Sequence, residues 1–106
     1  MRKVKILGTK YKIFEEATND DFPLLQNMDG FHDVTKKEIV IAGFANELGA
    51  DQDLDFVKNQ VTRHELIHAF MSESGMEEWS QNEQLVNWFA IQSPKIFKIF
   101  QKLDLL

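Results

Sequence analysis

The sequence contains no cysteine among its 106 residues. No disulfide can therefore hold the fold together, and any metal site must use nitrogen and oxygen ligands. Stability has to come from a packed interior, for which nine Phe, two Trp and four Met supply large apolar side chains. Because domains of about 100 to 150 residues are the commonest, we expect one compact domain spanning residues 1–106.

Two further absences limit the partners of the chain. No uncharged apolar run approaches the ~18 residues of a membrane span, and Gly8, Lys10 and Lys12 interrupt the first residues where a signal peptide would be apolar. The twelve Lys and Arg are scattered and the net charge is −5, whereas nucleic-acid binding needs a basic patch. We expect a cytoplasmic protein that binds neither membrane nor nucleic acid, and the oligomeric state is undefined.

The first half of the chain has the alternation of β-strands. VKILGTKYKIFEE alternates apolar and polar residues on both sides of Gly8-Thr9, with Val4, Ile6, Tyr11 and Ile13 as the inward set. After a less regular segment at 17–27, a turn signal at Asp29-Gly30 precedes residues 31–34 and KEIVIAG, which predict a second strand pair.

The second half, after a polar connection, has helical periodicity. Asp53 is the expected N-cap and Gly75 the stop of a helix of about twenty residues, whose second half is apolar nearly all round and is expected inside the domain. Beyond the loop MEEWSQ, two more helices are expected over 82–92 and 94–103, and the Phe and Ile stripe of 96–103 is expected in the core. Strands before helices predict an α+β fold: a small antiparallel sheet of three or four strands with helices on one face.

The stretch RHELIHAF, residues 63–70, carries the chemistry. His64 and His68 lie one helical turn apart, so both imidazoles can reach one zinc ion (Zn²⁺) at about 2.0 to 2.1 Å. Glu65 lies roughly 60 to 100° round the helix, where it can act as general base on a zinc-bound water without being a ligand. Zinc lowers the pKa of that water toward ~7, and the glutamate can pass its proton to the leaving amine.

The competing interpretation is an ordinary buried helix whose histidines bond to the backbone. Only three histidines occur in the chain, however, and two of them have this spacing with Glu65 between. An uncompensated glutamate among Leu, Ile and Phe would cost several kcal/mol. The pattern therefore favours a metal site.

A catalytic zinc normally has three protein ligands and one open position. The metzincin pattern is excluded, since Ser74 stands six residues after His68. Glu73 points away on the same helix, and Glu77 and Glu78 lie in a loop that we expect to be solvated.

Glu83 is the best candidate because it opens a helix in which the small Ala90 allows close approach to the first helix. The alternative is a capping box, in which Glu83 bonds back to the backbone of Ser80. If Asn82 is the N-cap instead, Glu83 is free to bind metal.

RHELIHAF, followed fifteen residues later by EQLVNWFA and then SPKI, resembles the small gluzincin-type metallopeptidases, in particular the ImmA/IrrE-like proteins of phages and mobile elements. The resemblance covers about residues 28 to 97. It implies a minimal zincin-like fold with the HExxH motif on its central helix. The ligands would be His64, His68 and Glu83, with Glu65 as the base.

Other groups could support catalysis by stabilising the oxyanion. Tyr11, His32 and Arg63 are candidates. Each has a competing interpretation: Tyr11 as an aromatic residue at the edge of the core, His32 as a loop residue, and Arg63 as a solvated helix residue. Asn87, one turn after Glu83, could orient the ligand carboxylate or simply be exposed. KEIVIAG could be an edge strand that receives substrate by strand addition, or an interior strand.

The sequence thus predicts a zinc-dependent metallopeptidase that hydrolyses peptide bonds in a peptide or protein substrate. The alternative is a non-catalytic, zincin-fold module of a phage or mobile element that binds or regulates another protein. Glu65 favours the enzyme, because a structural zinc site has no need of a general base.

Overall fold

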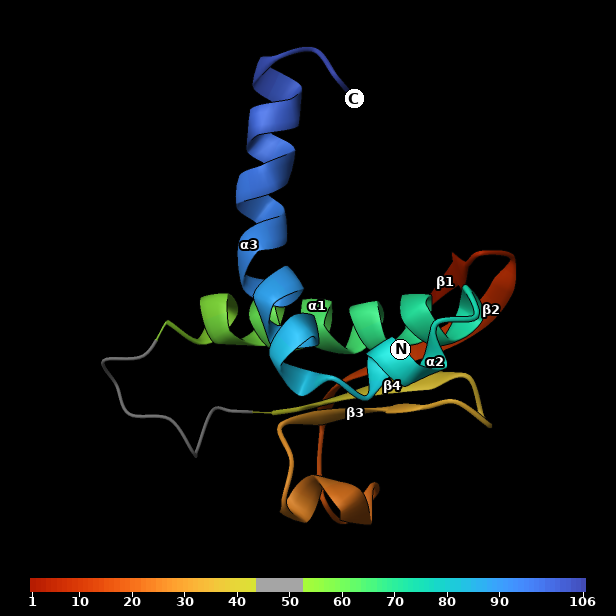
Figure 1. The fold of residues 1–106 in the computed structure, drawn as a ribbon. Helices are drawn as coiled ribbons and strands as arrows, with labels where there is room; N and C mark the ends of the chain where they lie inside the picture. The colour runs from red at the N-terminus through yellow and green to blue at the C-terminus, as the bar shows by residue number, and fades with distance from the viewer. Residues whose placement is uncertain (44–52) are drawn as a thin grey trace.

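The computed structural model describes residues 1–43 and 53–106, so most of the polar connection before the first long helix lies outside the described residues. The elements in order are β1 (Arg2–Ile6), β2 (Thr9–Ala17), the 3-10 helix η1 (Pro23–Gln26), β3 (Gly30–Asp33), β4 (Glu38–Ala42), α1 (Leu54–Glu73), α2 (Glu77–Ser80) and α3 (Glu83–Lys102). Four strands precede the three α-helices, and α1 lies across one face of the sheet (Figure 1). The predicted α+β class is confirmed.

The sheet has the strand order β1-β2-β4-β3. β1 and β2 form the expected hairpin through Leu7 and Gly8, whose φ angles of 49° and 87° make the tight turn. β3 and β4 form the second antiparallel pair, but β4 joins β2 in parallel, so the sheet is mostly and not wholly antiparallel. KEIVIAG is therefore an interior strand, and its proposed edge position is wrong. The edge next to it is β3.

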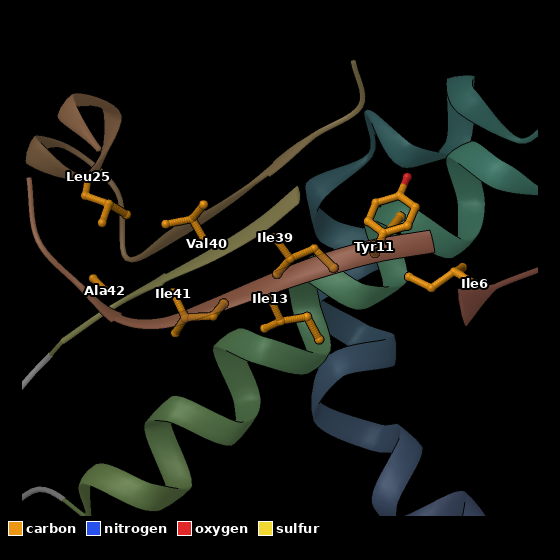
Figure 2. Close-up of a cluster of buried hydrophobic side chains, with 9 residues drawn as sticks. Ile6, Tyr11, Ile13, Leu25, Ile39, Val40, Ile41 and Ala42 are labelled. Atoms are coloured by element: carbon orange, nitrogen blue, oxygen red, sulfur yellow. The ribbon is translucent and has the colours of Figure 1, made fainter. Parts of the chain in front are cut away.

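The two faces of the sheet are covered by different elements. Ile13 lies opposite Ile39 in register, and together with Ile41 they face α1, which adds Val57 and Val61 (Figure 2).

On the other face, the register aligns Phe14 with Val40 and Val40 with Phe31. Phe22, just before η1, and Leu25, within η1, cover this face. Val4, predicted to point inward, is 39% exposed because it lies on the outer strand.

α1 begins and ends where the sequence predicts. The Asp53 carboxylate accepts a hydrogen bond from the Phe56 N–H at 3.1 Å, and Gly75 follows the helix with φ of +83°. The helix is less enclosed than expected. It buries Thr62, Glu65 and Ala69, but Phe70 is 54% exposed because its side of α1 faces away from the sheet.

α3 is one continuous helix, whereas the sequence predicted a break before Pro94. Proline has no N–H, so a helix passing through it leaves the carbonyl four residues earlier without its usual donor. Here that carbonyl belongs to Ala90, and Arg63 of α1 donates its Nε–H to it at 2.7 Å. Arg63 is thus a contact between helices and not a solvated residue.

The second half of α3 stands clear of the sheet and of α1 (Figure 1). Phe97, Ile99 and Leu103 are 53%, 58% and 61% exposed, so the prediction that this stripe forms core is wrong. Periodicity shows that a helix face is apolar, but it does not show what covers the face. Among the described residues, no helix combines the length and apolarity needed to cross a bilayer.

Gly30 allows β3 and α1 to approach closely. A Cβ at this position would lie 2.9 Å from the Val40 carbonyl oxygen and 3.1 Å from Cγ1 of Val61. We expect Gly30→Ala to lower the free energy of unfolding by about 1 to 3 kcal/mol, measured by chemical denaturation. Gly43→Ala is the control, because its Cβ would first meet the flexible Glu16 carboxylate. Equal losses in both variants would contradict this account of Gly30.

Candidate metal centre

α1 and α3 bring three ligand-type side chains to one point. The Nε2 atoms of His64 and His68 are 3.1 Å apart, as the spacing of one helical turn predicts. One carboxylate oxygen of Glu83 lies 2.9 Å from His64 Nε2 and the other lies 2.9 Å from His68 Nε2. These three residues form a candidate metal-binding cluster.

Glu83 is free to take part because Asn82 caps α3. The Asn82 side-chain oxygen accepts a hydrogen bond from the Leu85 N–H at 3.1 Å. The competing capping box, in which Glu83 would bond to the backbone of Ser80, is therefore not formed at this helix start. Capping by Asn82 leaves the Glu83 carboxylate turned toward the histidines.

The cluster has dimensions that suit a small divalent ion. Ligand atoms about 2.0 to 2.1 Å from a tetrahedral ion lie roughly 3.3 Å from one another, close to the 2.9 and 3.1 Å found here. Two imidazoles and one carboxylate leave a fourth position for a water or substrate. A small outward movement of the three side chains would accommodate the ion.

Ser80 holds His68 in place. Its Oγ lies 3.0 Å from His68 Nδ1 and 3.4 Å from the His68 carbonyl oxygen. If the hydroxyl donates to the carbonyl, it accepts from Nδ1–H, which leaves Nε2 unprotonated and able to bind a metal. Ser80 is 4% exposed. From the sequence, Ser80 was expected only as a possible helix cap in a capping box with Glu83. The short helix α2 that carries Ser80 was predicted to be a loop.

Glu65 is buried beside the cluster. It is only 6% exposed, and burial, followed by the nearby charge of Glu83, raises its pKa to about 7. No hydrogen bond to another side chain compensates for its burial among the described residues. A carboxylate in this position can accept a proton more readily than an exposed one.

The cluster opens into a cleft of about 520 Å³. Its lining comes from two sides: β3 and its flanks give Met28, Gly30, Phe31, His32 and Val34, and the helices give His64, Glu65, His68, Glu77, Ser80, Gln81 and Glu83. A second hollow of about 300 Å³ shares Gly30, His64 and Glu65 with the first. His64 and Glu65 therefore line both hollows, whereas His68 and Glu83 line only the first.

His32 lies in β3 and not in a loop, and it faces the cleft. The Tyr11 hydroxyl donates to Glu73 at 2.7 Å, so its oxygen accepts the Nε2–H of His32 at 3.2 Å. Burial, followed by the charge of His68, lowers the pKa of His32. The neutral ring then keeps Nδ1 as a hydrogen-bond acceptor, which suits a peptide N–H better than an oxyanion.

The remaining candidates do not belong to the metal-binding cluster. Tyr11 is buried at 1% exposure in the core. Asn87 is exposed and lines the second hollow with His64 and Glu65, so a role in orienting Glu83 stays a prediction. Glu77 and Glu78 are exposed on α2, and Glu77 lines the cleft.

Comparisons with protein family models, with curated proteins and with solved structures gave no significant match. The resemblance to gluzincin-type peptidases therefore stays a hypothesis drawn from the motif. What the geometry supports directly is a candidate metal site of His64, His68 and Glu83.

Glu73, at the C-terminal end of α1, connects this helix to the sheet through hydrogen bonds. Its carboxylate, 12% exposed, accepts hydrogen bonds from Lys37, Tyr11 and Thr9 at 2.7 to 2.8 Å, and these lower its pKa to about 2.

We expect Glu73→Gln to lower the free energy of unfolding by about 1 to 3 kcal/mol at pH 6. The unfolded carboxyl has an ordinary pKa near 4.5. The stabilisation is therefore complete above that pH and is lost as the pH falls toward 2. Urea unfolding of the wild type and Glu73→Gln should show a gap that narrows over this range. The exposed Glu78→Gln is the control, and a gap that stays constant with pH would contradict the assignment.

Proposed function

We propose that the protein is a zinc-dependent metallopeptidase that hydrolyses peptide bonds in an extended segment of a protein or peptide. The observation that carries the proposal is the convergence of His64, His68 and Glu83 beside the buried carboxylate of Glu65. A purely structural site would not need an acid at this place. Structural zinc sites also usually have four protein ligands.

Zinc is the ion that best suits this ligand set. Two imidazoles and a carboxylate, with no sulfur, match the ligands of catalytic zinc in peptidases. Bound here, zinc would polarise the substrate carbonyl and lower the pKa of a coordinated water.

The side chains of the chain would then move the proton. Glu65 lies next to His64 in sequence and lines both hollows, so it can take a proton from the attacking water. The same carboxyl can deliver that proton to the leaving amine. Its burial favours the protonated form and so supports this second step.

The edge of β3 that has no strand partner among the described residues supports binding of an extended substrate. β3 pairs with β4 on one side, and its residues line the cleft on the other. A peptide could add to this edge as a further strand, with backbone hydrogen bonds placing a carbonyl near the metal. This role, considered above for KEIVIAG, belongs to β3 because β4 is interior.

Metal analysis tests the ligands. We expect about one zinc per chain in the wild type and in Glu65→Gln, and zinc affinity at least ~100-fold lower in Glu83→Ala, because removing a ligand costs more than removing its hydrogen-bond partner. Glu78→Ala is the matched control, since this glutamate is exposed and outside the cluster. Unchanged zinc affinity in Glu83→Ala would refute its role as a ligand.

Cleavage of a peptide library tests turnover. The zinc-loaded wild type should cleave, and activity should fall by at least ~100-fold in Glu65→Gln, which keeps the metal but lacks the base. Chelation should abolish activity, and added zinc should restore it. If the zinc-loaded wild type cleaves nothing while still binding zinc, the protein is a non-catalytic binding module instead.

A further inference from the structure

The two hollows beside the candidate centre are lined by acidic side chains and by no lysine or arginine. Apart from the metal-binding cluster and Glu65, the only carboxylate in the first hollow is Glu77, and the only one in the second is Asp29. All the lysines and arginines of the described part of the chain lie outside both linings. A peptide that enters the hollows therefore meets negative charge in each of them.

No cation neutralises these two carboxylates in the ranges that the structure describes. None of the ion pairs found there includes either of them. Lys37, just before β4, is already bound to Glu73 at 2.7 Å. Residues 44–52, outside those ranges, contain no lysine, arginine or histidine. Both carboxylates are therefore available to a basic group of a bound peptide.

Gln81 orients the carboxylate of Glu77. Its side-chain amide donates a hydrogen bond to one Glu77 oxygen at 3.2 Å, and both residues line the first hollow. The other oxygen has no hydrogen-bond partner among the described residues, so it can accept from an ammonium or guanidinium group. The charge of Glu77 also acts on the strand side of the cleft, where burial lowers the pKa of His32 and Glu77 opposes that shift.

The first hollow also offers apolar surface to the aliphatic part of a basic side chain. Met28 and Val34 line it, and both are exposed. Lysine and arginine pack their carbon stems on such surface while their charged ends stay in contact with water. Exposed apolar side chains and an unpaired carboxylate in one hollow therefore suit a basic side chain better than an acidic one.

We propose that the cleft selects a basic segment of its substrate, with a lysine or arginine side chain bound by Glu77 in the first hollow. A second basic side chain would bind Asp29 in the other hollow. The inference rests on the proposed function and deepens it by naming the substrate class. Neither residue belongs to the metal-binding cluster, so they would determine which segment binds and leave the chemistry to the centre.

Binding to a variant without the base tests the preference apart from turnover. The probes are short fluorescein-labelled peptides of Ala, Ser and Gly whose central residues are Lys, Gln or Glu. With zinc-loaded Glu65→Gln, the Lys peptide should bind about 3- to 10-fold tighter than the Gln peptide, measured by fluorescence anisotropy. The Glu peptide should bind most weakly. Equal affinity for the Lys and Gln peptides would overturn the proposal.

Variants of α2 in the same background test the role of Glu77. Glu77→Gln should remove most of the preference for the Lys peptide, and Glu77→Lys should reverse it in favour of the Glu peptide. Glu78→Gln is the matched control, because it removes the same charge from the same short helix but lies outside the cleft lining. Equal losses in Glu77→Gln and Glu78→Gln would indicate general attraction by an acidic chain and overturn the assignment.

Cleavage sites in a peptide library separate this proposal from the proposed function. The zinc-loaded wild type should cut at fixed distances from basic residues. Glu77→Gln should lose the preference at one substrate position and Asp29→Asn at a different one, because they line different hollows.

The outcomes for the two proposals differ. Cleavage with no preference for basic residues would overturn the basic specificity and leave the peptidase standing. Binding of the Lys peptide that depends on Glu77, without any cleavage by the wild type, would support the basic-peptide site and refute the peptidase. Neither binding nor cleavage would overturn both.

Discussion

The contact between α1 and α3 is the constraint on which the candidate site depends. The two histidines come from α1 and the carboxylate from α3, so the cluster exists only while these helices keep their relative position. Arg63, directly before His64, bonds to the Ala90 carbonyl that Pro94 leaves without a donor. The carbonyl that Pro94 leaves without a donor in one helix is thus satisfied by a side chain of the other, which adds a bond to the contact between α1 and α3.

The surroundings of the cluster serve different purposes. Ser80 orients His68 through its second nitrogen, and Gly30 lets the edge strand approach α1. Glu73, deeper along α1, fastens the helix to the hairpin and is held ionised by Lys37 and its hydroxyl partners. Glu65 is the opposite case, a buried acid whose pKa is raised by burial and by the nearby charge of Glu83. Two glutamates of one helix are thus given different protonation behaviour by their neighbours.

Local rules predicted much of this arrangement. The positions of His64 and His68 follow from helical geometry, and the start of α1 follows from the N-cap Asp53. Because Asn82 is the N-cap of α3, Glu83 is available to bind a metal. What could not be predicted depends on contacts between distant residues. The parallel pairing of β2 with β4, the contact of Ser80 with His68 and the continuation of α3 through Pro94 each involve partners that no short window contains. The apolar stripe of α3 was recognised in the sequence, but periodicity alone placed it in a core, whereas much of it is exposed in the described part of the chain.

The two hollows share Gly30, His64 and Glu65 in their linings, so the buried acid and one histidine of the candidate centre are reached from two openings. A polypeptide that occupied both hollows would extend past the centre in both directions. In the proposed peptidase, such binding would favour internal bonds of a chain over the removal of single terminal residues.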